Sequence, residues 1–186
     1  MDKRKTAEKI IRNAGGIAKT SEFVSAGFSN FDVVNLCNDG YIVRIRHGYY
    51  QLAEKKDIKE EQILASLLPE GVVCVESALF YYGYSDFAPR QWSIAVPRTF
   101  SRTRLKFDTV PMKIYYIQNS QFEIGKTKEN FNGVNLTVYD RERTICDCFK
   151  YRTKLDNELF NKALNAYVID TKKNLSNSTF PADTSE

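Results

Sequence analysis

Few side chains of this 186-residue chain are spaced for catalysis. His47 is the only histidine and belongs to a His-Gly turn, so a histidine-based triad or dyad has one poor candidate. A magnesium-dependent nuclease needs carboxylates and a lysine at strand ends, for which Glu76, Asp108 and Lys113 are available. These three lack the acid-x-lysine pairing on one strand that nuclease sites show. We therefore expect no catalytic residues, no cofactor and no enzyme activity.

The four cysteines are expected to be reduced and structural. Cys37 and Cys148 fall at apolar positions of expected helices, and Cys74 lies in an apolar run. Cys146 and Cys148 are two residues apart, so on a helix they point to different sides and do not easily bind one ion. We expect no metal site.

A different chemistry is available between residues 29 and 47, where amides and cations gather. Asn30, Asn35 and Asn38 fall on the exposed side of a helix expected from about residue 30 to 39. The apolar Val33 and Leu36 fall on its other side. An asparagine amide pairs well with N6 and N7 of adenine in the major groove of DNA. This helix is therefore a candidate surface for reading duplex DNA.

Cations lie on either side of this helix in the sequence. Arg44, Arg46 and His47 lie on or beside the tip of an expected β-hairpin, from which they can reach phosphates or the minor groove. Residues 1–55 contain nine Lys/Arg against six Asp/Glu, which supplies +3 of the net charge of +4. The alternative is that the same helix and hairpin bind another protein rather than DNA. The predicted DNA-binding residues are Lys19, Ser29, Asn30, Asn35, Asn38, Arg44, Arg46 and His47.

The expected elements follow the order of a winged helix-turn-helix. A helix over residues 6–13 leads through a short link at residues 17–18 to a second helix, for which Thr20 is the expected N-cap. Ser29 is the expected cap of the third helix. Residues 41–52 then alternate as two strands around a His-Gly turn, which predicts the hairpin.

The pattern changes after residue 58, where helical and alternating segments predict a second domain. We expect an α+β chain, with a winged helix-turn-helix over about residues 1–53. The second domain, about 58–175, is expected to have a mixed or antiparallel sheet with flanking helices. The charged stretch 54–59 is the expected linker, and the polar tail 176–186 is expected to be disordered. The expected segments are helices 59–68, 76–82, 141–151 and 157–168, and strands 92–96, 112–117 and 134–138.

Two further groups in the second half are interpreted as structural. Asp140 is an expected N-cap, and Arg143 and Asp147 are four residues apart, so they can pair on one helix face. An aromatic cluster is expected to pack in the core rather than to stack on nucleic acid. Its members are Tyr81, Tyr82, Tyr84, Phe87 and Trp92.

Two stretches are specific in combination. Residues 40–50 read Gly-Tyr-Ile-Val-Arg-Ile-Arg-His-Gly-Tyr-Tyr, and residues 139–147 read Tyr-Asp-Arg-Glu-Arg-Thr-Ile-Cys-Asp. The first resembles the amino-terminal domain of the AbiEi antitoxins, which belong to type IV toxin–antitoxin systems of bacterial abortive phage infection. The second, with Trp-Ser-Ile-Ala-Val-Pro at 92–97, is similar to the second domain of that family. The resemblance covers about residues 5–175.

The resemblance implies a repressor that binds inverted repeats in the promoter of its own operon. It also implies neutralisation of a cognate nucleotidyltransferase-type toxin, AbiEii, with the second domain as the antitoxin part. Inverted repeats imply two copies on DNA, formed from either a monomer or a dimer in solution. Family members continue the terminal helices with a basic, apolar-patterned segment, which residues 178–186 do not resemble.

A second basic run, which comprises Arg98, Arg102, Arg104 and Lys106, is open to two interpretations. It is either a DNA-facing or toxin-facing patch, or a solvated loop whose charges protect a strand edge.

No apolar run is long enough for a membrane span and no signal segment is present, so we expect a cytoplasmic protein. The alternative function is a winged-helix transcription regulator with a ligand-sensing or partner-sensing second domain.

Overall fold

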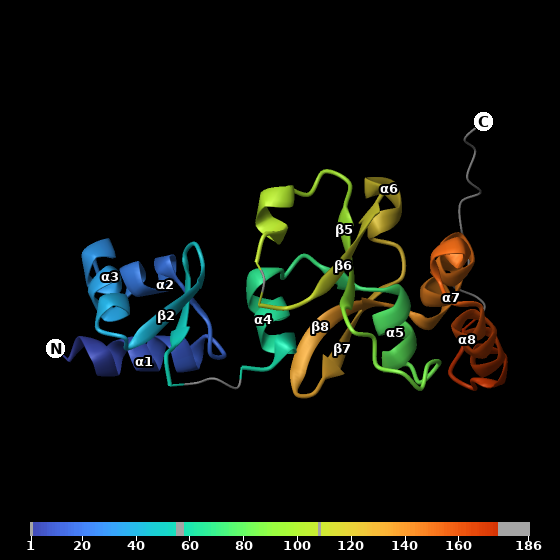
Figure 1. Cartoon of the computed structure of the whole chain (residues 1–186), viewed down its shortest axis with the longest axis horizontal. Coiled ribbons are helices and arrows are strands. Elements are labelled where there is room, and N and C mark those ends of the chain that lie inside the picture. Colours follow the sequence, from blue (N-terminus) through green and yellow to red (C-terminus); the bar gives the residue numbers. More distant parts are fainter. Residues whose placement is uncertain (1, 55–57, 108, 175–186) are drawn as a thin grey trace. The chain divides into compact units, whose positions relative to one another are not determined.

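The computed structural model describes residues 2–54, 58–107 and 109–174. They form a mixed α+β structure with two sheets and flanking helices, which confirms the predicted class at that level (Figure 1). The chain divides into two compact units. The expected linker residues 55–57, the nuclease candidate Asp108 and the expected disordered tail 176–186 lie outside the described residues, so the predicted domain boundaries stay a prediction. Unit 1 comprises Met1–Pro69, Ser101–Val110 and Asn130–Val134, and unit 2 comprises Glu70–Phe100, Pro111–Glu129 and Asn135–Glu186.

In unit 1, three helices gather against a small antiparallel sheet of order β1-β3-β2 (Figure 1). Strands β2 and β3 form the predicted hairpin around His47 and Gly48, and Gly48 has a φ of +79° that a side chain would disfavour. The elements are α1 (Lys3–Asn13), β1 (Ala18–Lys19), α2 (Thr20–Ser25), α3 (Asn30–Asn38), β2 (Ile42–Arg46) and β3 (Tyr49–Leu52). Helix α4 (Glu60–Leu67) and the 3-10 helix Arg102–Leu105 also belong to this unit.

Aromatic and aliphatic side chains of α1, α2 and α3 close the core beside the sheet. Phe23 of α2 is fully buried, and its ring makes edge-to-face contacts with Phe28 and Tyr50 at centroid distances of 5.7 and 5.9 Å. Val33 and Leu36 turn the inner side of α3 into this core, as the helical repeat predicts. The core therefore fixes which side of α3 remains exposed.

Two predictions about the start of α2 are wrong. Residues 17–18 were expected as a link, but Ala18 and Lys19 pair with Tyr50 and Tyr49 as strand β1. Thr20 was the expected N-cap, but it is the first residue of α2, and Lys19 takes the cap position. The Glu22 carboxylate accepts the Lys19 N–H at 2.6 Å. A two-residue strand carries no periodicity, so sequence alone does not separate it from a loop.

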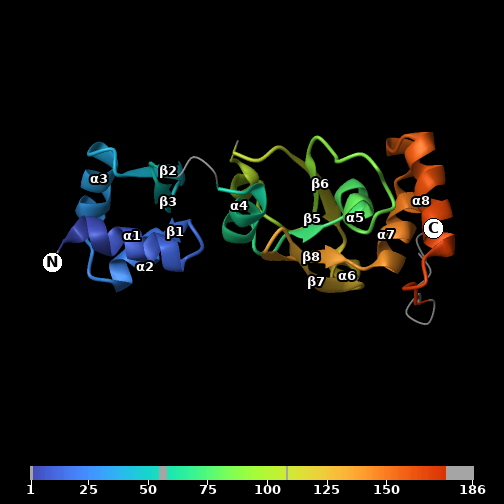
Figure 2. The ribbon, with the colours of Figure 1, turned by 90° about the horizontal axis from the view of Figure 1, so that it is seen from below.

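Unit 2 is built on a mixed sheet of order β6-β5-β4-β8-β7. Strand β4 runs antiparallel to β5 and parallel to β8, while β5 runs parallel to β6. Helices α5, α7 and α8 lie side by side (Figure 2). The strands are β4 (Val72–Val73), β5 (Trp92–Pro97), β6 (Met112–Ile117), β7 (Lys126–Phe131) and β8 (Val134–Tyr139). The helices are α5 (Val75–Tyr81), α6 (Asn119–Phe122), α7 (Arg141–Lys150), the 3-10 turn Arg152–Lys154 and α8 (Asn157–Ile169).

Arg143 forms a buried ion pair within α7 and also binds the segment that precedes β7. The Arg143 and Asp147 side chains are each 3% exposed, and Arg143 Nε donates to Asp147 Oδ1 at 3.0 Å, which confirms the predicted pairing. Arg143 Nη1 also donates to the carbonyls of Gln121 and Ile124 at 2.8 and 3.0 Å. Because a buried guanidinium needs its donors satisfied, this pair fixes the path of the loop that contains Gly125.

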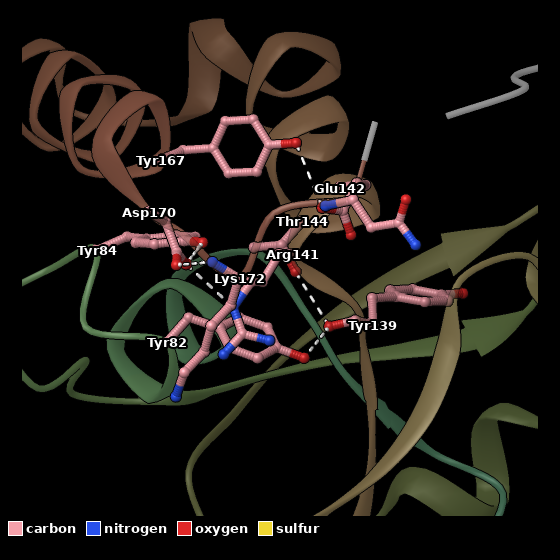
Figure 3. Close-up of polar contacts among 10 residues, drawn as sticks. Tyr82, Tyr84, Tyr139, Arg141, Glu142, Thr144, Tyr167, Asp170 and Lys172 are labelled. Atoms are coloured by element: carbon pink, nitrogen blue, oxygen red, sulfur yellow. Dashed lines mark hydrogen bonds and ion pairs between the residues drawn. The ribbon is translucent and has the colours of Figure 1, made fainter. Parts of the chain in front are cut away.

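A second network ties the end of α8 to α5 and α7 (Figure 3). Both the Tyr84 hydroxyl and Arg141 Nε donate to Asp170 Oδ2, at 2.5 and 3.1 Å. The Tyr84 hydrogen bond is the main reason why the pKa of Asp170 lies below its usual value. The Tyr82 hydroxyl donates to the Tyr139 carbonyl at 3.0 Å. The aromatic cluster is thus largely structural, as predicted, with Tyr84 buried.

Phe87 contradicts the prediction for that cluster. It was expected in the core, but 78% of its surface is exposed. It lies in a loop after α5, where no helical or strand repeat fixes the direction of a side chain.

Gly125 should be the least replaceable glycine of unit 2. Its φ is +76°, and an added Cβ would lie 2.7 Å from Arg143 Cβ. Gly83 has the same φ of +76° but open space around it, so Gly83→Ala is a matched control for backbone strain alone. We expect Gly83→Ala to lower the free energy of unfolding by about 1 kcal/mol, and Gly125→Ala by roughly 1–3 kcal/mol more. Urea denaturation measures both, and equal losses would contradict the tight contact.

Candidate nucleic-acid interface

Helix α3 is capped at its first turn by a reciprocal pair. Ser29 Oγ accepts the Asp32 N–H at 3.2 Å, and Asp32 Oδ2 accepts the Ser29 N–H at 3.0 Å. This arrangement confirms Ser29 as the predicted cap. Because its hydroxyl is used in the cap, Ser29 positions the helix, and any contact it makes with DNA adds to that role.

Asp32 also joins α3 to α1. Lys3 Nζ lies 2.5 Å from Asp32 Oδ1, and Arg4 Nη2 lies 2.9 Å from Asp39 Oδ2 at the other end of α3. The Lys3 hydrogen bond, followed by those from Ser29, lowers the pKa of Asp32 to about 2. Both acids of the α3 region are therefore neutralised by α1, which reduces the repulsion that an approaching phosphate would meet.

The asparagine face predicted for α3 is present. Asn30 and Asn38 are exposed and Asn35 is half-buried, whereas Val33 and Leu36 are buried on the opposite side. Phe31 and Val34 lie on the same outer side of α3, and no function is predicted for them from the sequence. They are 71% and 50% exposed, so two apolar side chains lie among the amides on this face.

The hairpin separates the two predicted arginines. Arg44 is exposed, and His47 is exposed at the turn. Arg44 is close enough to α3 for its charge to act on the Cys37 thiol, although burial dominates and raises the pKa of that thiol. The hairpin thus offers at least one exposed cation beside α3.

Arg46 is held by its own unit. Its Nη1 lies 3.5 Å from the Leu67 carbonyl at the end of α4, a long contact. Its guanidinium carbon lies 5.7 Å from the centre of the Tyr49 ring and 5.9 Å from that of Phe107. This half-buried position is less suited to a phosphate contact than that of Arg44. The partners lie 21 and 61 residues away in the chain, so no local pattern could have indicated them.

Lys19 is exposed, with its ammonium 5.9 Å from the centre of the Tyr49 ring on the hairpin. The Thr20 N–H donates to the Gly48 carbonyl at 2.9 Å. The start of α2 is therefore bonded to the tip of the hairpin. This link places a second exposed cation on the same small sheet as Arg44.

The second basic run is divided between the two units. Arg98 belongs to unit 2, while Arg102, Arg104 and Lys106 belong to unit 1, three of the four being exposed and Arg104 half-buried. We therefore do not treat the four as one surface.

The remaining nuclease candidates come together around one carboxylate. Glu76 accepts from Lys113 Nζ at 2.6 Å, from the Ser93 hydroxyl at 2.7 Å and from the Tyr115 hydroxyl at 2.9 Å. Burial raises the pKa of Glu76, but these hydrogen bonds outweigh burial and lower it overall. Within the described ranges, no group of three His, Cys, Asp or Glu side chains is placed to hold a metal ion. No described helix has the length and apolar content that a membrane span requires.

Comparisons with known proteins inform the fold alone. No family model matches the sequence, and no curated protein matches it. Among solved structures, the chain is similar to the RV2827C protein from Mycobacterium tuberculosis, with a TM-score of 0.56 and 11% sequence identity. The match covers 86% of this chain and 70% of that chain.

The Lys3–Asp32 contact predicts a local pH response. With the pKa of Asp32 lowered to about 2, its contribution to stability is fully present above the ordinary value of 3.8 and is lost as the pH falls through about 2. Lys3→Ala should raise the pKa of Asp32 towards 3.8, which an NMR titration of the carboxyl group measures. The exposed Lys5 of the same helix gives the control Lys5→Ala, which should leave that pKa unchanged. An equal shift in both variants would exclude a specific contact.

Proposed function

We propose that the chain is a DNA-binding antitoxin that represses its own toxin–antitoxin operon and neutralises a nucleotidyltransferase-type toxin. In this proposal the elements α1 to β3 act as a winged helix-turn-helix. Their order, the three-stranded sheet and the two-residue hairpin support that assignment. The observation that carries DNA binding is the exposed amide face of α3, with its acids paired to α1 and with the exposed Arg44 on β2, the strand that contacts α3.

The positions of these residues assign some of them to the bases and others to the sugar–phosphate backbone. Helix α3 enters the major groove, where Asn30 and Asn38 meet base edges. Arg44, His47 and Lys19 bind the sugar–phosphate backbone or the adjacent minor groove, which fixes the register of α3. Two copies bind the two halves of an inverted repeat.

The antitoxin part of the proposal rests on the resemblance to AbiEi proteins. The stretch 139–147 carries most of that resemblance, and most of its side chains are buried, including Glu142, Arg143 and Asp147. Internal residues cannot contact a partner. The similarity there concerns the fold of unit 2, and the toxin-binding residues lie elsewhere on its surface.

Separate arginine variants test the hairpin. With the duplex upstream of the chain's own gene as probe, Arg44→Ala should weaken binding and reduce the slope of log affinity against log salt by about 1. Arg46→Ala is the matched control, because Arg46 contacts Leu67 and two aromatic rings, and its salt slope should remain that of the wild type. Gel-shift titrations at several salt concentrations measure both. A wild-type slope for Arg44→Ala would remove Arg44 from the phosphate contacts.

Co-expression tests the second activity with the full chain. The variant carrying both Asn30→Ala and Arg44→Ala should lose repression of a promoter reporter, while cells that also express a nucleotidyltransferase-type toxin encoded beside the chain's own gene still survive. This result follows if DNA and toxin use different surfaces. If cells that express the double variant at wild-type levels of folded protein stop growing, DNA and toxin do not use different surfaces.

The second candidate is a winged-helix regulator whose second domain senses a ligand or a partner, and the observation behind it is an open pocket in unit 2. Its volume is about 300 Å³, and its lining includes Glu76, Phe87, Leu159 and Lys162. Genome context separates the two candidates, because an adjacent nucleotidyltransferase gene supports the antitoxin. A lone gene beside a metabolic operon supports the regulator.

A further inference from the structure

The outer face of α3 combines two kinds of side chain. Asn30, Val34 and Asn38 follow one another at intervals of four residues, so they form one stripe along the helix. Phe31 and Asn35 form a second stripe beside it. Phe31 is 71% exposed and Val34 is 50% exposed, so neither belongs to the core, which Val33 and Leu36 complete from the other side.

This face contains no basic residue. None occurs between Asn30 and Asn38, and the acids Asp32 and Asp39 are held by Lys3 and Arg4. Guanine is most often recognised by arginine or lysine through O6 and N7, and α3 offers neither. Adenine is recognised by asparagine, and the methyl group of thymine by apolar side chains. The chemistry of the face therefore matches A·T pairs at both bases.

We propose that α3 reads A·T base pairs, with its amides on adenine and with Phe31 and Val34 against the methyl groups of thymine. This inference rests on the proposed DNA binding and specifies the sequence class that the site prefers. Duplex DNA is favoured over a protein partner because the exposed cation Arg44 lies beside α3. Arg44 lies on β2, the strand that contacts α3, and its charge acts on Cys37 of that helix, while Lys19 lies on β1 at the other edge of the same sheet.

The first experiment determines the preferred sequence without assuming an operator. The full-length protein selects from a library of random 20-base-pair duplexes, and the bound fraction is sequenced. We expect enriched half-sites dominated by A·T pairs at the positions that α3 covers. Enrichment of G·C pairs at those positions would overturn the proposal.

The second experiment removes only the methyl groups. Each thymine of the selected half-site is replaced by uracil, which keeps the hydrogen-bonding edge and lacks the 5-methyl group. We expect the wild type to lose affinity roughly fourfold per contacted methyl, the factor that corresponds to burial of one such group. Phe31→Ala and Val34→Ala should bind the thymine probe more weakly and show a smaller uracil effect.

A matched control is available on α2. Val24 is 51% exposed, close to the 50% of Val34, so Val24→Ala removes the same atoms at the same exposure from a different helix. It should keep the wild-type affinity and the full uracil effect. Thermal unfolding checks that all variants are folded, which is expected because the substitutions lie on the surface.

The outcomes separate this inference from the proposed function. If the wild type binds thymine and uracil probes equally while Arg44→Ala still weakens binding, DNA binding stands and methyl recognition is wrong. If no duplex is retained by the wild type, both the proposed DNA binding and the A·T preference fail. A uracil effect that persists unchanged in Phe31→Ala and Val34→Ala also overturns the proposal, because other residues then contact the methyl groups.

Discussion

The Asp32 carboxylate is the point on which the candidate interface depends. One of its oxygens closes the cap of α3 by accepting from the Ser29 backbone, and the other meets Lys3 of α1. A single side chain thus caps the first turn of α3 and anchors the helix to α1, and Lys3 compensates its negative charge on the surface that would approach DNA. The buried face formed by Val33 and Leu36 fixes the rotation of α3 about its axis, while Asp32 fixes the N-terminal end of the helix.

Features that depend on residues close together in the chain were predictable from the sequence. Ser29 capped α3 as expected, the hairpin turned at His47 and Gly48, and Arg143 paired with Asp147 one helical turn later. Strands β4 and β7 were missed for two different reasons. Strand β4 has two residues, too few for a period, and β7 reads Lys-Thr-Lys-Glu-Asn-Phe, whose charges hide its place in the sheet.

Interactions between distant residues explain the remaining differences. Lys3 meets Asp32 across 29 residues, and Arg46 meets the Leu67 carbonyl across 21. Neither partner is indicated by spacing, since only the folded core brings them together. The DNA-binding residues predicted from the sequence therefore fall into different physical classes. Asn30, Asn38 and Arg44 are exposed, Ser29 is a cap, and Arg46 is held by its own unit.

The lack of cations on α3 has a consequence for how such a protein would find its site. Attraction to any stretch of DNA comes from the few cations around the helix, and the choice among sequences comes from uncharged groups on the helix. Residence on random DNA and recognition of the correct site are then carried by different side chains. The time spent scanning the chromosome can be adjusted through the hairpin without altering the sequence that α3 prefers.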